Sequence, residues 1–199
     1  MAPGQNAVAG LVVVAALAAG STLISRVPGP DEIARQPFLH SGQVGTAIHL
    51  RTGEIVVEGV QASTRVRQGA TTATTSAHWL VITVRYTAAD TPSTLAGMTL
   101  ESRDGRSYSL ARPFHTACGV GQPGVTITCS MPFEVPAAAL EGARLRVPAA
   151  LLGGGAGDDV ANVDLGIDAA AATRLEQSTD PLRIEAVTVV GSPGTGASP

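Results

Sequence analysis

Two patterns of hydrophobic residues divide this chain. Ala7–Ile24 is one continuous apolar run without a charged residue, whereas the residues after about position 44 alternate between apolar and polar in short stretches. Alternation with a period of two is typical of half-buried β-strands, and clusters of Gly, Pro, Asn or Asp between such stretches are typical of turns. The pattern therefore predicts an apolar helix followed by a domain built from strands.

The clearest strand pattern lies in two neighbouring stretches. Glu54–Arg67 alternates along its length, and Gly59 within it indicates a β-bulge. His78–Thr87 has apolar residues on both faces at its start, which is typical of a strand in the centre of a sheet. Between them, Gln68–Ala77 is rich in Thr, Ala, Gly and Ser, and it is interpreted as a loop.

Shorter candidate strands fill the rest of the domain. Asp104-Gly105 separates two of them, Met98–Ser102 and Ser107–Leu110, and predicts a tight hairpin. About seven to nine short strands with frequent turn signals, and no long amphipathic helix, predict an all-β fold of the antiparallel β-sandwich type. The remaining candidates are Ala47–Leu50, Gly124–Cys129, Met131–Val135, Ala143–Val147, Val160–Ile167 and Leu182–Val190.

These patterns and the local composition predict six segments. The Gly-, Ser- and Pro-rich end of the chain is expected to be disordered, and the Pro-rich segment before the sandwich is interpreted as a stalk. The segments are 1–6, a short N-terminal piece; 7–25, a transmembrane signal anchor; 26–43, the stalk; 44–167, the sandwich; 168–190, an extension with a short helix and a strand; and 191–199, the tail.

The apolar run is long enough to cross a bilayer. As a helix its residues would cover roughly 27 Å, close to the ~30 Å hydrocarbon core. The first side-chain cation, Arg26, follows the run, so the distribution of positive charge does not orient it. Two alternatives stay open, a signal peptide cleaved after Ala16-Leu17-Ala18 and a buried core helix.

The amino-acid composition argues against several classes of function. All 13 cationic residues are Arg, so lysine-based covalent catalysis is excluded, and a net charge of −3 without a basic cluster argues against nucleic-acid binding. Aromatic residues make up 3% of the chain, which disfavours the stacking platforms common in carbohydrate-binding proteins.

Cys118 and Cys129 are the two cysteines of the chain. They are eleven residues apart across a Pro-Gly turn, so they can face each other on a hairpin, and an exported domain would oxidise them. Such a disulfide would stabilise the fold by about 2–3 kcal/mol in the chain-entropy model. The alternative is a pair of independent buried thiols.

Several motifs follow one another in an order that is similar to that of a known group of domains. It consists of His78–Thr87 followed by Asp90, the segment Ser102–Tyr108, the turn Pro123-Gly124, and Phe133-Glu134-Val135-Pro136. From about Gly42 to Ile167 the chain resembles the telokin-like, immunoglobulin-like sandwiches of small exported proteins from high-GC Gram-positive bacteria. The resemblance implies an extracytoplasmic binding or accessory role and no catalytic residues. The chain departs from the pattern because its cysteines are expected to staple one hairpin rather than bridge two sheets, and because it continues for about thirty residues past the expected last strand.

Side chains that could carry chemistry are scattered. Cys118 with His115 could act as a nucleophile and base, but the disulfide competes for that sulfur. A Gly-x-Ser-x-Gly elbow is absent from the sequence. Asp158, Asp159, Asp164 and Asp168 could offer oxygen ligands to calcium, and His40, His49, His78 and His115 nitrogen ligands to zinc, but neither spacing fits a known loop. The sequence therefore predicts no catalytic, cofactor-binding or metal-binding residue.

These observations predict a single-pass membrane protein with its C-terminal domain outside the cytoplasm. We expect a non-catalytic binding or accessory module of the cell envelope, whose edge strands and Leu182–Val190 contact a partner protein. One alternative function is a sandwich that binds a small hydrophobic or lipid ligand between its sheets. Another is a cleaved, secreted form of the same domain.

Overall fold

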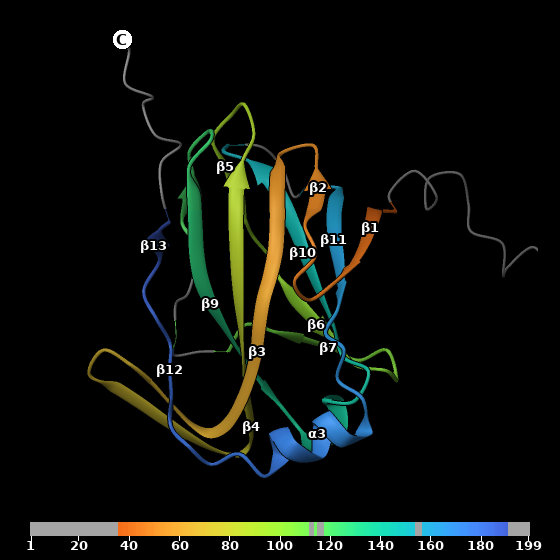
Figure 1. The fold of residues 1–199 in the computed structure, drawn as a ribbon, viewed down its shortest axis with the longest axis vertical. Coiled ribbons are helices and arrows are strands. Elements are labelled where there is room, and N and C mark those ends of the chain that lie inside the picture. Colours follow the sequence, from red (N-terminus) through yellow and green to blue (C-terminus); the bar gives the residue numbers. More distant parts are fainter. Residues whose placement is uncertain (1–35, 112–113, 115–117, 154–156, 191–199) are drawn as a thin grey trace, which may run out of the picture. The chain divides into compact units, whose positions relative to one another are not determined.

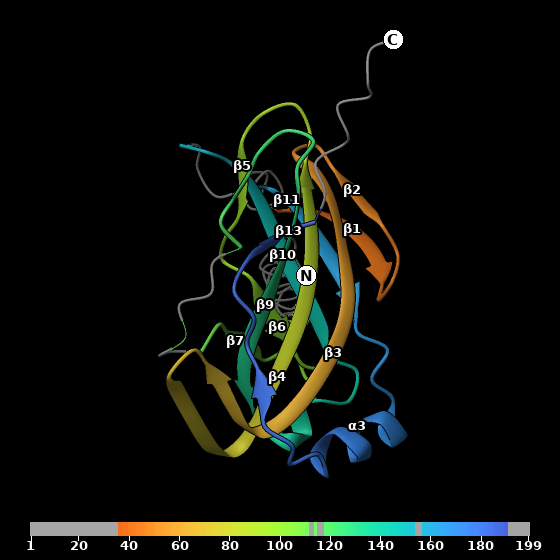
Figure 2. The same ribbon diagram turned by 60° about the vertical axis from the view of Figure 1, so that its left-hand side comes forward.

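Two β-sheets stacked face to face make up most of the computed structural model, which describes residues 36–111, 114, 118–153 and 157–190 (Figures 1 and 2). The predicted all-β class is confirmed. Most strand pairs are antiparallel, but β1 pairs with β11 and β12 pairs with β3 in parallel.

One layer is a six-stranded sheet, called here the covered sheet. Its strand order is β12-β3-β4-β9-β13, and β2 adds to β3. The strands are β2 (Ile48–Leu50), β3 (Gly53–Gln68), β4 (Thr71–Ala88), β9 (Thr126–Val135), β12 (Leu182–Arg183) and β13 (Thr188–Val189).

The second layer is a seven-stranded sheet, called here the open sheet. Its order is β1-β11-β10-β5-β8, while β6 pairs with β10 and with β7. The strands are β1 (Phe38–Gln43), β5 (Ser93–Leu95), β6 (Thr99–Glu101), β7 (Ser107–Ser109), β8 (Val120–Gly121), β10 (Arg144–Leu151) and β11 (Asp159–Asp164).

Strand β4 lies in the centre of the covered sheet, between β3 and β9, as its apolar pattern predicts. Leu80, Ile82, Val84 and Tyr86 on its inner face are completely buried in the core between the sheets. The Tyr86 hydroxyl donates to the Thr52 carbonyl at 3.0 Å, so the polar end of this side chain also has a partner. The core is therefore filled by side chains from the central strand.

The predicted loop at 68–77 is wrong. Strands β3 and β4 form one long hairpin that turns at Gly69-Ala70, and Gln68 pairs with Thr71. Thr-rich sequence suits an extended backbone because β-branched side chains pack well on a pleated sheet. The expected irregularity at Gly59 is present, since the register shifts between Val57 and Gly59.

The Asp-Gly hairpin is confirmed. Glu101 of β6 pairs with Ser107 of β7, and the Ser102 amide donates to the Arg106 carbonyl at 2.9 Å. Gly105 has φ +82°, a backbone conformation that glycine adopts at little cost.

The boundary between the predicted stalk and the sandwich needs correction. Residues 38–43, placed at the end of the stalk by their composition, form β1 at the edge of the open sheet. Gly42 allows this pairing, because a Cβ there would lie 2.5 Å from the Ile48 side chain. The strand joins the sheet through a partner more than a hundred residues away, which composition does not reveal.

The C-terminal extension lies on the covered sheet. After helix α3 (Ala169–Glu176), the chain pairs briefly with β3 as β12 and then with β9 as β13, at the opposite edge of the sheet (Figure 2). Between these two contacts Ile184 is buried. We call residues 182–190 the strap, because this segment crosses the outer face of the sheet. The single strand expected at Leu182–Val190 is thus two short ones.

The predicted anchor at 7–25 and tail at 191–199 lie outside the described residues. Within the part of the chain that the structure describes, no helix has the length and apolar character needed to span a bilayer.

Candidate functional site

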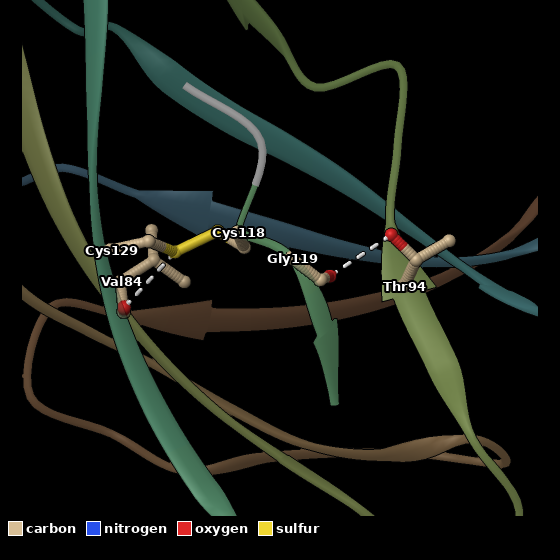
Figure 3. Close-up of a disulfide and its surroundings, with 5 residues drawn as sticks. All are labelled: Val84, Thr94, Cys118, Gly119 and Cys129. Atoms are coloured by element: carbon tan, nitrogen blue, oxygen red, sulfur yellow. Dashed lines mark hydrogen bonds between the residues drawn. A yellow bond between two sulfur atoms is a disulfide. The ribbon is translucent and has the colours of Figure 1, made fainter. Parts of the chain in front are cut away.

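The disulfide between Cys118 and Cys129 is confirmed, with a Cα–Cα distance of 5.2 Å (Figure 3). Both half-cystines are buried in the core. The Cys129 sulfur lies 3.5 Å from the Val84 carbonyl oxygen, a packing contact because a disulfide sulfur carries no proton to donate. The sulfur of Cys118 is therefore bonded and shielded, which leaves no thiol for the nucleophile considered for it.

The disulfide connects the two layers, so the expected hairpin staple is wrong. Cys129 lies on β9 of the covered sheet. Cys118 leads directly into β8, which pairs with β5 of the open sheet, and the Thr94 hydroxyl donates to the Gly119 carbonyl at 3.3 Å (Figure 3). The short loop between β8 and β9, which contains the Pro-Gly turn, crosses from one sheet to the other instead of joining two strands of one ladder.

The acidic residues considered for calcium are separated by the fold. Asp164 accepts from the Gly166 amide at 2.9 Å, and Asp168 caps helix α3 by accepting from the Ala171 amide at 2.7 Å. Asp158 and Asp159 lie at the opposite end of β11. Among the described residues, no group of three or more His, Cys, Asp or Glu side chains could hold a metal ion.

Asp159 is a buried carboxylate on β11 that contacts β1 of its own sheet and the residue that follows β2 of the covered sheet. It accepts from the Arg51 amide at 2.6 Å and lies 2.5 Å from the His40 ring nitrogen. Burial raises the pKa of Asp159, but the hydrogen bonds from the Arg51 amide and the His40 ring outweigh it, so the pKa lies below its ordinary value. The charged form of Asp159 is thus part of the folded state.

Exposed apolar side chains gather at one end of the sandwich, called here the apolar end. At this end β1 begins, β10 ends at Leu151, and the last residues of the strap pair with β9 (Figure 1). Phe38 is 63% exposed and Leu152 60% exposed. The other exposed large apolar residues toward this end are Leu39, Val120, Leu151, Val189 and Val190.

The outer face of the open sheet is polar. On β10 and β11 the residues Leu145, Val147, Ala161 and Val163 point into the core, so the alternating residues point outward. Register then places outward polar residues on five adjacent strands. They are Ser41 and Gln43 on β1, Asn162 and Asp164 on β11, Arg144 and Arg146 on β10, Thr99 and Glu101 on β6, and Ser107 and Ser109 on β7.

A recess of about 670 Å³ opens on this polar face. Its charged groups are arranged in pairs: Arg146 with Glu101 at 2.6 Å, Arg103 with Glu141 at 2.9 Å, and Arg144 with Asp164 at 3.8 Å. Its rim includes Gly166 and the first residue of α3. A fourth carboxylate, Asp168, accepts from the Ala171 amide at the start of α3. The recess thus combines several strands and a helix end around three ion pairs and one helix-capping carboxylate.

Asn162 is the most unusual residue of the recess. Its side chain is buried, with 8% of the residue exposed, yet its Oδ1 has no hydrogen-bond partner among the described residues. The buried Nε of Arg146, the residue directly opposite on β10, is also without a partner there. Buried polar atoms are paired in the great majority of cases, so two adjacent exceptions in one recess mark a candidate binding site.

Sequence reasoning missed this site. The alternation of Val160–Ile167 and Ala143–Val147 does show which of their residues share a face. The recess, however, is assembled by pairing β10 with β11 and β6, and Arg146 and Glu101 are 45 positions apart. A polar residue at an outward strand position is ordinary, and only its burial distinguishes Asn162.

Comparison with known proteins supplies no assignment. No protein-family model matches the chain, and no curated protein matches it. The chain is similar to the crystal structure of the yjhA protein from Bacillus subtilis, with 14% identity and a TM-score of 0.44, over 62% of this chain and 99% of that one. A similarity at this level carries no argument, so function is argued from the residues themselves.

Proposed function

We propose that this chain is a membrane-anchored, extracytoplasmic immunoglobulin-like domain that acts as a non-catalytic binding or accessory module in the cell envelope. The observation that carries the extracytoplasmic part is the buried Cys118–Cys129 disulfide between the two sheets. Structural disulfides form and persist in oxidising compartments and are rare in the cytosol.

The apolar end supports an orientation toward the membrane. Phe38, Leu39, Leu151 and Leu152 expose apolar surface where β1 begins, and clustered exposed apolar residues mark contact surfaces. The thirteen residues between Ile24 and Phe38 reach at most roughly 45 Å when fully extended. A tether of this reach permits the apolar end to meet the bilayer, and the exposed apolar residues are the reason for proposing that it does.

A labelling experiment tests the anchoring and the orientation together. The full chain is reconstituted into phosphatidylcholine vesicles with a bimane label on Leu152→Cys or, at the opposite end of the domain, on Arg103→Cys. We expect flotation with the vesicles, and quenching by lipid-attached nitroxide only for the label at 152. Equal quenching at both positions would overturn the orientation, and failure to float would overturn the anchor.

The intact mass of the mature protein shows whether the N-terminal segment is cleaved. Loss of about the first eighteen residues would mean that the domain is secreted and has no tether.

The accessory role is tested by purification from solubilised membranes. We expect the wild type and Arg103→Ser to retain the same envelope protein, and Val189→Ser/Val190→Ser, at the exposed end of the strap, to lose it. Recovery of monomer alone in several mild detergents, or identical retention by all three proteins, would contradict a partner that contacts the strap.

A second candidate function is binding of a small hydrophobic ligand. Its support is a recess of about 560 Å³ between helix α3 and strand β3, with an apolar part formed by Val60, Ala62, Leu165 and Leu175. The space between the sheets is filled by core side chains, so this recess is the alternative location. Native mass spectrometry after incubation with oleate should show a bound molecule, and Ala171→Phe should remove it. No bound mass, or equal binding by both proteins, would exclude this function.

A further inference from the structure

We infer that the recess around Asn162 binds an uncharged, hydroxyl-rich ligand with the chemistry of a glycan segment. The inference deepens the proposed binding role, and it rests on that role only for the setting in which such a ligand would be met. Three features of the recess support it, namely its free hydrogen-bonding atoms, its ion pairs and its position on the face of the sheet.

The first observation is the amide of Asn162. Its Oδ1 is buried, accepts from no described residue and belongs to a side chain that lines the recess. A buried acceptor without a donor weakens a fold, because the water it loses on burial is not replaced. An apolar side chain would serve folding better at this position, so the amide is better explained by a donor that arrives from outside.

The second observation is the geometry of the neighbouring donor. Arg146 and Asn162 are paired directly across β10 and β11, and both side chains point to the outer face. Residues so placed have Cβ atoms about 5 Å apart. The Arg146 Nε–H can donate while the Asn162 Oδ1 accepts, so a matching ligand must offer an acceptor and a donor close together. A hydroxyl group offers both, and two hydroxyls on adjacent ring carbons offer them side by side.

The third observation is the balance of charge. Arg146, Arg103 and Arg144 each have a carboxylate partner, and Asp168 already caps helix α3. An anionic ligand would have to compete with the three paired carboxylates for guanidinium groups, and a cationic ligand with the guanidinium groups for those carboxylates. The fourth carboxylate, Asp168, is already stabilised by the Ala171 amide and the helix N-terminus, which reduces its attraction for a cation. An uncharged polar ligand avoids both costs.

An extended peptide fits this recess less well, although its backbone also offers donors and acceptors. Peptides commonly bind sheets by adding a strand to a free edge. The recess lies instead on the face of the sheet, where β10 already pairs with β11 on one side and with β6 on the other. The backbones of β10, β11 and β6 are already paired with one another, so their side chains carry the recognition, and planar amide and guanidinium groups suit adjacent hydroxyls.

Among the described residues that line this recess, none has an aromatic side chain. Recognition would therefore depend on hydrogen bonds without ring stacking, and a single sugar should bind weakly. A repeating polymer presented to many anchored copies gains strength by avidity. The experiment must therefore use a multivalent display.

The test uses the full chain in detergent micelles on a printed array of neutral oligosaccharides, namely glucans, mannans, galactans and arabinans. Acidic oligosaccharides and extended peptides are printed as further arms. Asn162→Val and Arg146→Met remove the two free groups. Arg183→Ala removes an exposed arginine of the covered sheet and is the matched control.

We expect binding to at least one neutral glycan, a loss of tenfold or more in each recess variant, and unchanged binding by Arg183→Ala. Circular dichroism must show the same fold in all four proteins. Binding confined to acidic glycans or peptides, equal binding by all variants, or no binding to any glycan would each overturn the inference. Vesicle flotation of the same proteins reports on the anchor separately, so failure of the glycan site is distinguishable from failure of the proposed function.

Discussion

The outer faces of the two sheets differ in polarity and in burial. On the covered sheet, Trp79 and Val81 point away from the main core, yet both are buried beneath the strap residue Ile184 and beside Phe114. On the open sheet, Arg144 and Asp164 lie on the outer face and are partly solvent-exposed. Within the described part of the chain, the C-terminal segment thus covers the outer face of one sheet, whereas the outer face of the other carries the polar recess.

The difference follows from the central strand. Since β4 is apolar on both faces, the sandwich alone would leave Trp79 in water, and the strap with Phe114 forms a second, smaller core over it. The rings of Trp79 and Phe114 meet edge to face, with centroids 5.4 Å apart. Around the recess, β10 and β11 carry Arg144, Arg146, Asn162 and Asp164 outward. A polar face that still buries an unpaired amide is better explained by binding than by folding.

The largest expected effect is on the covered face. Trp79→Ala should lower the free energy of unfolding by about 3–5 kcal/mol, because it empties the centre of the second core. Trp79→Phe should cost far less, since the Trp79 indole N–H has no described partner to lose. Chemical denaturation followed by circular dichroism measures both. Equal, small losses would mean that this face is not a core.

The strap provides the next test. Ile184→Ala should destabilise by about 2–4 kcal/mol, because it removes the buried side chain that attaches the strap. Val189→Ala, at a position 66% exposed, should change stability by less than about 0.5 kcal/mol. In the wild type the Ile184 N–H donates to the Arg67 carbonyl, so the amide at position 184 should exchange faster with solvent in Ile184→Ala than in the wild type or Val189→Ala. If both variants behave alike, the strap does not form a packed layer.

At the edge of the open sheet, attachment is polar and should depend on pH. Because the pKa of Asp159 is lowered in the folded protein, its carboxylate stabilises the fold above the unfolded-state pKa of about 3.9, and this contribution is lost as the pH falls through the folded value. Asp159→Asn should cost about 1–3 kcal/mol at pH 7, and the difference from wild type should shrink below about pH 4. Urea titrations across this range measure it, and a constant difference would contradict the role given to the charge.

The smallest effect is expected at Asn162. Asn162→Val should leave the free energy of unfolding unchanged within about 0.5 kcal/mol or raise it, because an unpaired buried amide is replaced by a side chain that favours strands. Thermal unfolding of the two proteins gives the comparison. A clear loss of stability would show that Asn162 serves the fold, and it would weaken the contrast between the covered and open faces.

The local pattern of residues was sufficient to predict some strands and turns and insufficient to predict others. The central position of β4, the bulge at Gly59 and the hairpin at Asp104-Gly105 were all predictable, because each depends on residues close together in the chain. The strand at 71–77 was misread as a loop because Thr-rich sequence is common in both. Strand β1 was misread because its partner is far away in sequence.

The cysteine pair likewise shows that local sequence does not reveal which distant strands become neighbours. Spacing and turn chemistry were enough to predict that Cys118 and Cys129 are bonded, but they suggested one hairpin. The bond joins two layers because β8 pairs with β5 rather than with β9. Which strand is the neighbour depends on the whole topology, and short strands carry little information about it.

By itself, the sequence determined the all-β class, the central strand, the bonded cysteines and the separation of an apolar N-terminal run from the domain. Each of these depends on periodicity, composition or local turns. Only the tertiary structure decided that the strap buries Trp79 and that the disulfide joins the sheets. It also decided that Asn162 and Arg146 meet in a recess where the Oδ1 of one and the Nε of the other have no described partner. Burial and pairing across distant strands are properties of the assembled sandwich, because they depend on which polar atoms lose water and which neighbours replace it.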